Sequence, residues 1–223
     1  AQKKIESNNF GIRKNLLEYD QVMNEQREVI YKERRRVLDG ENMRDVIYNM
    51  INEDAEEIID RNINEDAYPS EWDMKALNQE LLDIFPMEKV ELSEDDLKHM
   101  SKKDLVQRVK ETVNKLYEAK ETEFPEPEMI REEERVILLK VIDRKWMDHI
   151  DDMEQMRQGI GLRALGQRDP LVEYKMSGFD MFDDMIANIQ EDTVRLLFHV
   201  RIEQKVEREQ VAKVTGTNKD DSV

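Results

Sequence analysis

Hydrophobic residues recur with helical spacing along most of the chain. The apolar positions of the first 38 residues are separated by three, four or seven places: Ile12, Leu16, Tyr19, Met23 and Ile30. This spacing is typical of one face of an α-helix. It predicts a single long helix that continues through an isolated glycine and ends at Asp39-Gly40, because glycine is favoured just after a helix.

The middle of the chain carries shorter apolar stripes, which predict four or five short helices between residues 42 and 122. Prolines interrupt the stripes and mark the breaks between these helices. Ser70, Ser93 and Ser101 resemble helix N-caps, because each is followed three residues later by an aspartate. A proline-rich stretch from Phe124 to Pro127 ends this region.

Two further long helices are predicted beyond this boundary. The first covers residues 128–158, where Leu138, Ile142, Trp146 and Ile150 lie four residues apart. The second carries an apolar stripe as far as Val200. A glycine-containing stretch joins them, so the two helices should form an antiparallel hairpin. The chain is therefore predicted to be all-α, with a polar, disordered tail over 206–223.

Charge is distributed unevenly and supports the same division. The 223 residues include 35 Lys or Arg and 52 Asp or Glu, which gives a net charge of −17. By count, 39–127 contains eleven basic and twenty-five acidic residues. Together with its own helix caps and its Pro- or Gly-marked borders, this acidity predicts that the middle region can move as a separate unit. A net acidic chain also argues against nucleic-acid binding.

Several kinds of chemistry are not suggested by the sequence. It contains no cysteine, which excludes disulfides and thiolate zinc sites, and no G-x-x-x-x-G-K-[ST] phosphate loop. The Asp96/His99 and His149/Asp152 pairs have helical spacing, and we interpret them as solvated polar faces rather than metal ligands. No signal peptide or apolar run of about 20 residues is present. We therefore expect a cytosolic, non-catalytic chain or fragment.

The predicted hairpin loop is locally basic. Arg157, Arg163 and Arg168 lie in a stretch without acidic residues between Glu154 and Asp169. Capping of a helix that ends at Gly159 would account for Arg157, whereas a tip that contacts a partner would account for all three arginines. Both interpretations remain open at this stage. Trp146 and the helically spaced methionines are interpreted as core, with an adaptable partner surface as the alternative.

Two long motifs then point to a known family. The opening AQKKIESNNFGIRKNLLEYDQVMNEQR and the later MRQGIGLRALGQRDPLVEY resemble segments of the SecA preprotein translocase family, and the resemblance covers about residues 1–205. It implies that residues 1–40 form a long scaffold helix and 41–124 an inserted helical wing domain. Residues 125–205 would form an antiparallel two-helix finger. The segment would couple ATP-driven motor motion to preprotein movement through the SecY channel.

The resemblance also implies where contacts are made. The finger tip would touch the channel and the moving polypeptide through eight residues: Gly161, Leu162, Arg163, Ala164, Leu165, Gly166, Gln167 and Arg168. The family commonly has an aromatic residue where this chain has Leu165, so apolar contact without a ring is expected there. Independently of the resemblance, the position of Arg157 near a predicted helix end and the helical spacing of Trp146 predict that both residues support the finger structurally.

The same resemblance suggests partners and location. ATP and Mg would be bound by motor domains absent from this sequence, so no cofactor and no metal are expected in the segment itself. The implied partners are the SecA motor domains, the SecYEG channel, unfolded preproteins, an anionic membrane surface and a second SecA copy in a dimer. The protein would be cytoplasmic and peripherally associated with the inner face of the cell membrane. The alternative is a stand-alone helical adaptor or regulator.

Overall fold

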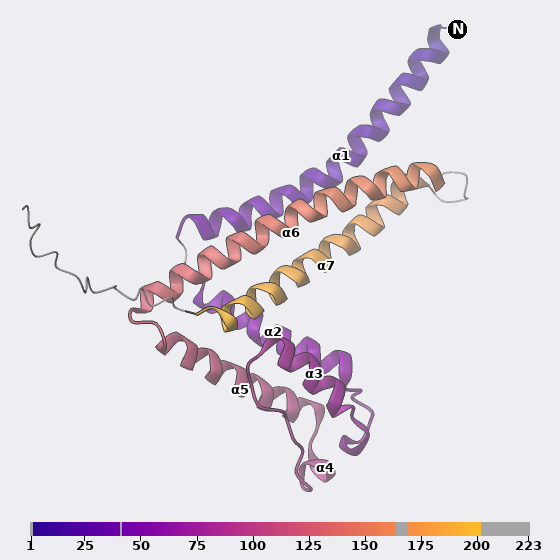
Figure 1. Ribbon diagram of the computed structural model, residues 1–223. Coiled ribbons are helices and arrows are strands. Elements are labelled where there is room, and N and C mark those ends of the chain that lie inside the picture. Colours follow the sequence, from indigo (N-terminus) through magenta and orange to yellow (C-terminus); the bar gives the residue numbers. More distant parts are fainter. Residues whose placement is uncertain (1, 41, 164–168, 202–223) are drawn as a thin grey trace, which may run out of the picture.

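The computed structural model describes residues 2–40, 42–163 and 169–201, and every regular element in these ranges is a helix (Figure 1). Side chains are described over 16–40, 42–160 and 169–201. The elements are α1 (Gln2–Leu38), α2 (Arg44–Asn62), η1 (Pro69–Glu71), α3 (Met74–Ile84), α4 (Asp96–His99), α5 (Lys102–Thr122), α6 (Pro127–Arg163) and α7 (Pro170–His199). The all-α prediction is confirmed.

The first helix ends where the sequence predicted. Its last residue is Leu38, and Gly40 follows with a φ of 80°, in the left-handed region that favours glycine. The Gly40 N–H donates to the Val37 carbonyl at 3.2 Å, which satisfies one of the terminal acceptors of the helix. The chain then changes direction, and α2 begins at Arg44.

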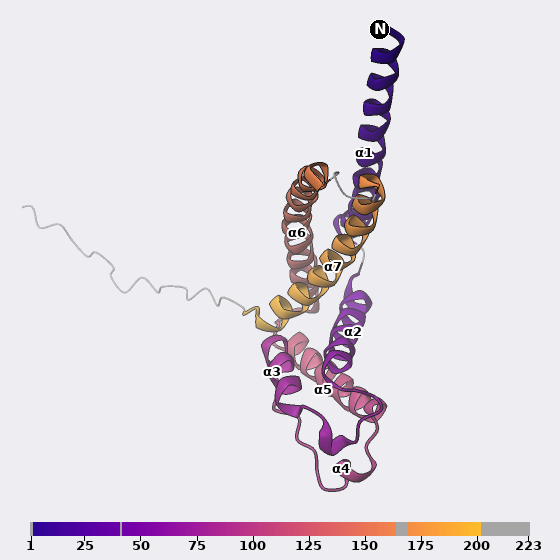
Figure 2. The ribbon, with the colours of Figure 1, turned by 90° about the vertical axis from the view of Figure 1, so that its right-hand side faces the viewer.

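Helices α6 and α7 lie side by side and run antiparallel, and α1 packs along both of them (Figures 1 and 2). The prediction that the first of these helices ends at residue 158 is wrong, because α6 continues to Arg163. Ile160 is buried with Met153 and Tyr174, and this packing offsets the roughly 1 kcal/mol that a glycine costs inside a helix. Within the described part of the chain, no helix is long and apolar enough to cross a membrane.

The shorter helices gather at the end of the hairpin where α6 begins and α7 ends (Figure 1). Helix α2 packs against α5, α3 and α7. Phe198 of α7 contacts Phe85 and Tyr117 edge to face, with ring centroids 5.4 Å apart in each pair. One hydrophobic core therefore continues from α1 through the short helices to the end of α7. Independent motion of residues 41–124 stays a prediction, and it would require these aromatic contacts to part.

Of the three predicted caps, Ser101 is the N-cap of α5, whereas the N-cap of α4 is Asp95 rather than Ser93. The Ser101 hydroxyl accepts from the Asp104 N–H at 3.2 Å, and the Ser101 N–H donates back to the Asp104 carboxylate at 3.0 Å. Ser93 and Asp96 form the same reciprocal pair. The prediction for Ser70 is wrong, because it lies inside η1. The cap of α3 is Asp73, which accepts from the Ala76 N–H at 3.0 Å.

A polar network links the start of α2, the end of α5 and the first turns of α6. These are the places where the chain passes from a long helix to the short helices and back again. Arg44, at the start of α2, donates two hydrogen bonds to Glu121 at the end of α5, at 3.0 and 3.1 Å. Arg131 of α6 contacts Glu121 and also bonds Glu134 at 2.6 Å. The buried Glu134 accepts from the Tyr117 hydroxyl at 2.7 Å. Burial raises the pKa of Glu134, while Tyr117 and Arg131 oppose that rise.

Candidate functional site

The predicted contact tip spans the segment of sequence that connects α6 to α7. Residues 164–168 (Ala164, Leu165, Gly166, Gln167 and Arg168) fall outside the described residues. Gly161, Leu162 and Arg163 form the last turn of α6, and their side chains also lie outside the described ones. Helix α7 begins at Pro170, with Asp169 as its cap. The contacts assigned to these eight residues remain predictions.

Arg157 does not cap the end of α6, because the helix continues for six residues beyond it. Its guanidinium pairs with the Glu154 carboxylate at 2.8 Å, one turn earlier on the same helix. Both side chains are partly exposed, so this pair contributes little to stability. Arg157 lines a cavity of about 470 Å³ between α1 and the hairpin. Tyr19 and Tyr174 also line it, and their rings meet edge to face with centroids 4.7 Å apart.

The buried polar contacts that hold α1 to the hairpin centre on Gln26, whose side chain is 8% exposed. The Gln26 amide nitrogen donates to the Gly178 carbonyl of α7 at 2.8 Å. Its carbonyl oxygen lies 2.8 Å from Nε2 of His149 on α6. One glutamine thus bridges all three long helices.

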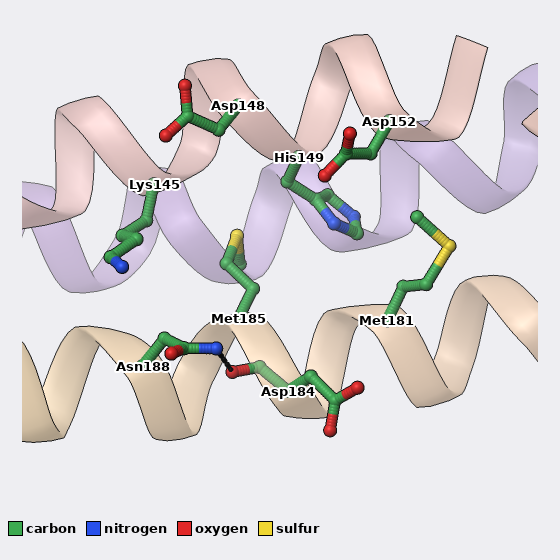
Figure 3. A pocket seen from close by; sticks show the side chains of 8 residues that line it. All are labelled: Lys145, Asp148, His149, Asp152, Met181, Asp184, Met185 and Asn188. Atoms are coloured by element: carbon green, nitrogen blue, oxygen red, sulfur yellow. Dashed lines mark hydrogen bonds between the residues drawn. The ribbon is translucent and has the colours of Figure 1, made fainter. Parts of the chain in front are cut away.

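His149 contradicts the prediction of a solvated face, since it is only 4% exposed. Figure 3 shows its ring pointing from α6 into the space between the helices. The ring packs against Trp146, itself buried, and Phe182, with centroids 5.6 and 5.8 Å away. Burial lowers the pKa of His149, and nearby Asp152 opposes that change. Burial therefore favours the neutral imidazole.

The sequence contained a signal for this position that the motif search missed. His149 lies three residues after Trp146 and four before Met153, which places it on the same apolar helix face. The helical spacing of His149 and Asp152 had instead suggested a polar face. Among the described residues, no three His, Cys, Asp or Glu side chains are grouped to hold a metal ion.

Gly178 allows α7 to approach α6 closely. A Cβ at this position would lie 2.8 Å from the methyl carbon and 3.3 Å from the sulfur of Met153. These separations are shorter than ordinary van der Waals contact.

A second polar tie joins α2 to α7. The Gln190 amide donates to one oxygen of Asp54 at 2.9 Å, and Asp54 is 5% exposed. The other Asp54 oxygen is buried and has no hydrogen-bond partner. Burial raises the pKa of Asp54 to about 7; the Gln190 bond opposes the rise, and nearby Glu191, Glu57 and Glu53 add to it. Sequence reasoning also missed this group.

These features define a helical scaffold: a long helix packed along an antiparallel hairpin, with a cluster of short helices at one end. The buried polar side chains described above link these helices to one another. Residues 1–201 match the family described as the SecA Wing and Scaffold domain, and the chain belongs to this family.

The chain is similar to several curated proteins named protein translocase subunit SecA. The match is 66% identical over the whole chain for the protein of Lachnoclostridium phytofermentans and 48% over 96% of the chain for that of Caldicellulosiruptor saccharolyticus. A protein of Alkaliphilus metalliredigens named SecA 1 is 53% identical over 96% of the chain. These matches cover 26%, 25% and 24% of the respective relatives. The chain thus spans about a quarter of their length.

Proposed function

We propose that this chain is a non-catalytic, force-coupling part of a SecA-type protein-export motor. In this proposal, motor domains elsewhere in the parent protein bind and hydrolyse ATP, and α1 follows their movement. The hairpin α6–α7 carries that movement to its tip, which touches an unfolded preprotein and the SecYEG channel. The parent would act at the inner face of the cell membrane.

The observation that best supports this role is the packing of α1 along both hairpin helices (Figure 2). Gln26 bonds α6 and α7, and Arg34 pairs with Asp143 of α6 at 2.7 Å. Because packed helices resist deformation, a shift of α1 would move the hairpin with it. A stand-alone adaptor would not require a long helix tied to both hairpin helices.

Complementation of a motor fragment tests the proposal. A SecA-type motor lacking this region would be mixed with the 223-residue chain, SecYEG vesicles, ATP and an unfolded preprotein. We expect transport only when both pieces are present. The Leu165→Tyr chain should keep or improve transport, whereas Leu165→Gly should impair it.

Two outcomes would contradict the proposal. One is a chain that fails to bind the motor fragment, and the other is transport by the motor fragment alone at the rate seen with the chain. ATP hydrolysis by the purified 223-residue chain would instead contradict the assignment of all turnover to the missing motor domains.

A further inference from the structure

The bonds around Gln26 have a defined direction. A backbone carbonyl such as that of Gly178 can only accept, so the amide nitrogen of Gln26 must face it. The amide oxygen of Gln26 must then face His149, and it can also only accept. Nε2 of His149 therefore carries the proton. This order, from His149 through Gln26 to Gly178, fixes both the amide orientation and the histidine tautomer.

This arrangement specifies register more strictly than apolar packing does. Hydrophobic contact is non-directional, so apolar packing by itself selects among helix registers less sharply than paired polar groups do. Sliding α1 by one turn, about 5.4 Å, would separate the Gln26 amide from the Gly178 carbonyl and would leave the His149 N–H buried without its acceptor. Buried groups without partners are strongly disfavoured. The exposed Arg34–Asp143 pair can be replaced by water and offers no such constraint.

We infer that Gln26 and His149 are positioning residues that fix α1 in register with the α6–α7 hairpin and so set how much motor movement reaches the tip. The assignment of motor coupling rests on the proposed function, whereas the register itself rests on the contacts between α1, α6 and α7. Gly178 takes part in the same set of contacts, because its carbonyl accepts the hydrogen bond from Gln26.

Three substitutions separate hydrogen bonding from packing. Gln26→Met removes both bonds and keeps a side chain of similar length. His149→Phe keeps a ring against Trp146 and Phe182 but cannot donate. His149→Gln loses the ring and restores a donor near the position of Nε2. The matched control is Gln21→Met, because Gln21 is exposed on α1 and bonds only within that helix, to Glu25, in the described contacts.

The first measurement uses the 223-residue chain alone. Nitrogen NMR should show His149 as the neutral Nε2–H tautomer. Spin labels introduced through Glu28→Cys and Asp180→Cys, both exposed sites, should report one narrow distance between α1 and α7. We expect that distribution to broaden or shift in Gln26→Met and His149→Phe. It should be retained in His149→Gln and Gln21→Met.

The second measurement uses a full-length SecA-type translocase carrying this segment, and it compares preprotein transported with ATP hydrolysed. We expect the ratio to fall about fivefold or more in Gln26→Met and His149→Phe. It should stay within about twofold of the parent in His149→Gln. Rescue by a donor without a ring would not occur if His149 acted only by packing.

Failure of this inference and failure of the proposed function would give different results. A translocase that transports nothing with the unsubstituted segment contradicts the proposed function. The inference is overturned if Gln26→Met leaves a single narrow spin-label distance, or if His149 has the Nδ1–H tautomer. It is also overturned if transport per ATP is unchanged in Gln26→Met while the unsubstituted segment supports transport.

Discussion

Replacing Asp54 with asparagine is expected to stabilise the chain above pH 7 and to flatten its pH dependence. The carboxyl group is buried between α2 and α7, and one of its oxygens has no partner. Asparagine keeps an oxygen that can accept from Gln190. Its amide could donate to the Met50 carbonyl one turn earlier, as Asn52 and Asn62 do to their own preceding turns on α2.

The size of the effect follows from the pKa of Asp54, raised from 3.8 to about 7 by burial. At about 1.4 kcal/mol per pKa unit, this rise gives an upper limit of about 4 kcal/mol. Between these two pKa values the native state binds the proton more strongly than the unfolded state does. As the pH rises through this window, the buried Asp54 loses its proton in the folded state. The free energy of unfolding therefore falls. Allowing for relaxation around the charge, we expect Asp54→Asn to gain about 2 kcal/mol at pH 8 and almost nothing at pH 4.

Urea unfolding followed by circular dichroism between pH 4 and 8 measures this difference directly. Subtracting the curve of the unsubstituted chain removes the contributions of all other titrating groups. Asp83→Asn is the matched control, because Asp83 is exposed on α3, and it should stay within about 0.5 kcal/mol throughout. A difference for Asp54→Asn that is the same at pH 4 and pH 8 would refute the reasoning.

Three other substitutions test local features of the fold, each by thermal or urea unfolding at pH 7. Ser101→Ala should lose about 1 kcal/mol, because it removes one half of a reciprocal cap; an unchanged midpoint would contradict that role. Gly159→Ala should gain about 0.5–1 kcal/mol, since a Cβ there meets nothing within 4 Å inside a continuous helix; destabilisation would mean that α6 is interrupted there. Arg34→Ala should cost less than about 1 kcal/mol, because its pair with Asp143 is exposed, and a larger loss would show that the pair is energetically important.

The long helices could be predicted because their apolar periodicity extends over many turns. The end of α1 was also clear, since Gly40 adopts the conformation that glycine favours. The end of α6 was not clear, because helix propensity alone suggests a stop at Gly159. The burial of Ile160 against Met153 and Tyr174 depends on α7, which is distant in sequence. Tertiary packing thus outweighed a local preference.

The polar contacts between helices were harder to predict than the helices themselves. Gln26 and His149 are separated by 123 residues in sequence, and Asp54 and Gln190 by 136. Neither pair forms a recognisable motif, and each is brought together only by the packing of long helices. The eight tip residues came from a family resemblance, and their roles remain predictions.

Crosslinking from position 165 during transport tests the central claim most directly. A photoreactive residue would replace Leu165 in a full-length SecA-type translocase carrying this segment, and position 97 in α4 would serve as the control site. The account predicts ATP-dependent crosslinks from position 165 to both the preprotein and the channel, at levels well above those from position 97. Active transport without either crosslink from position 165 would contradict the account.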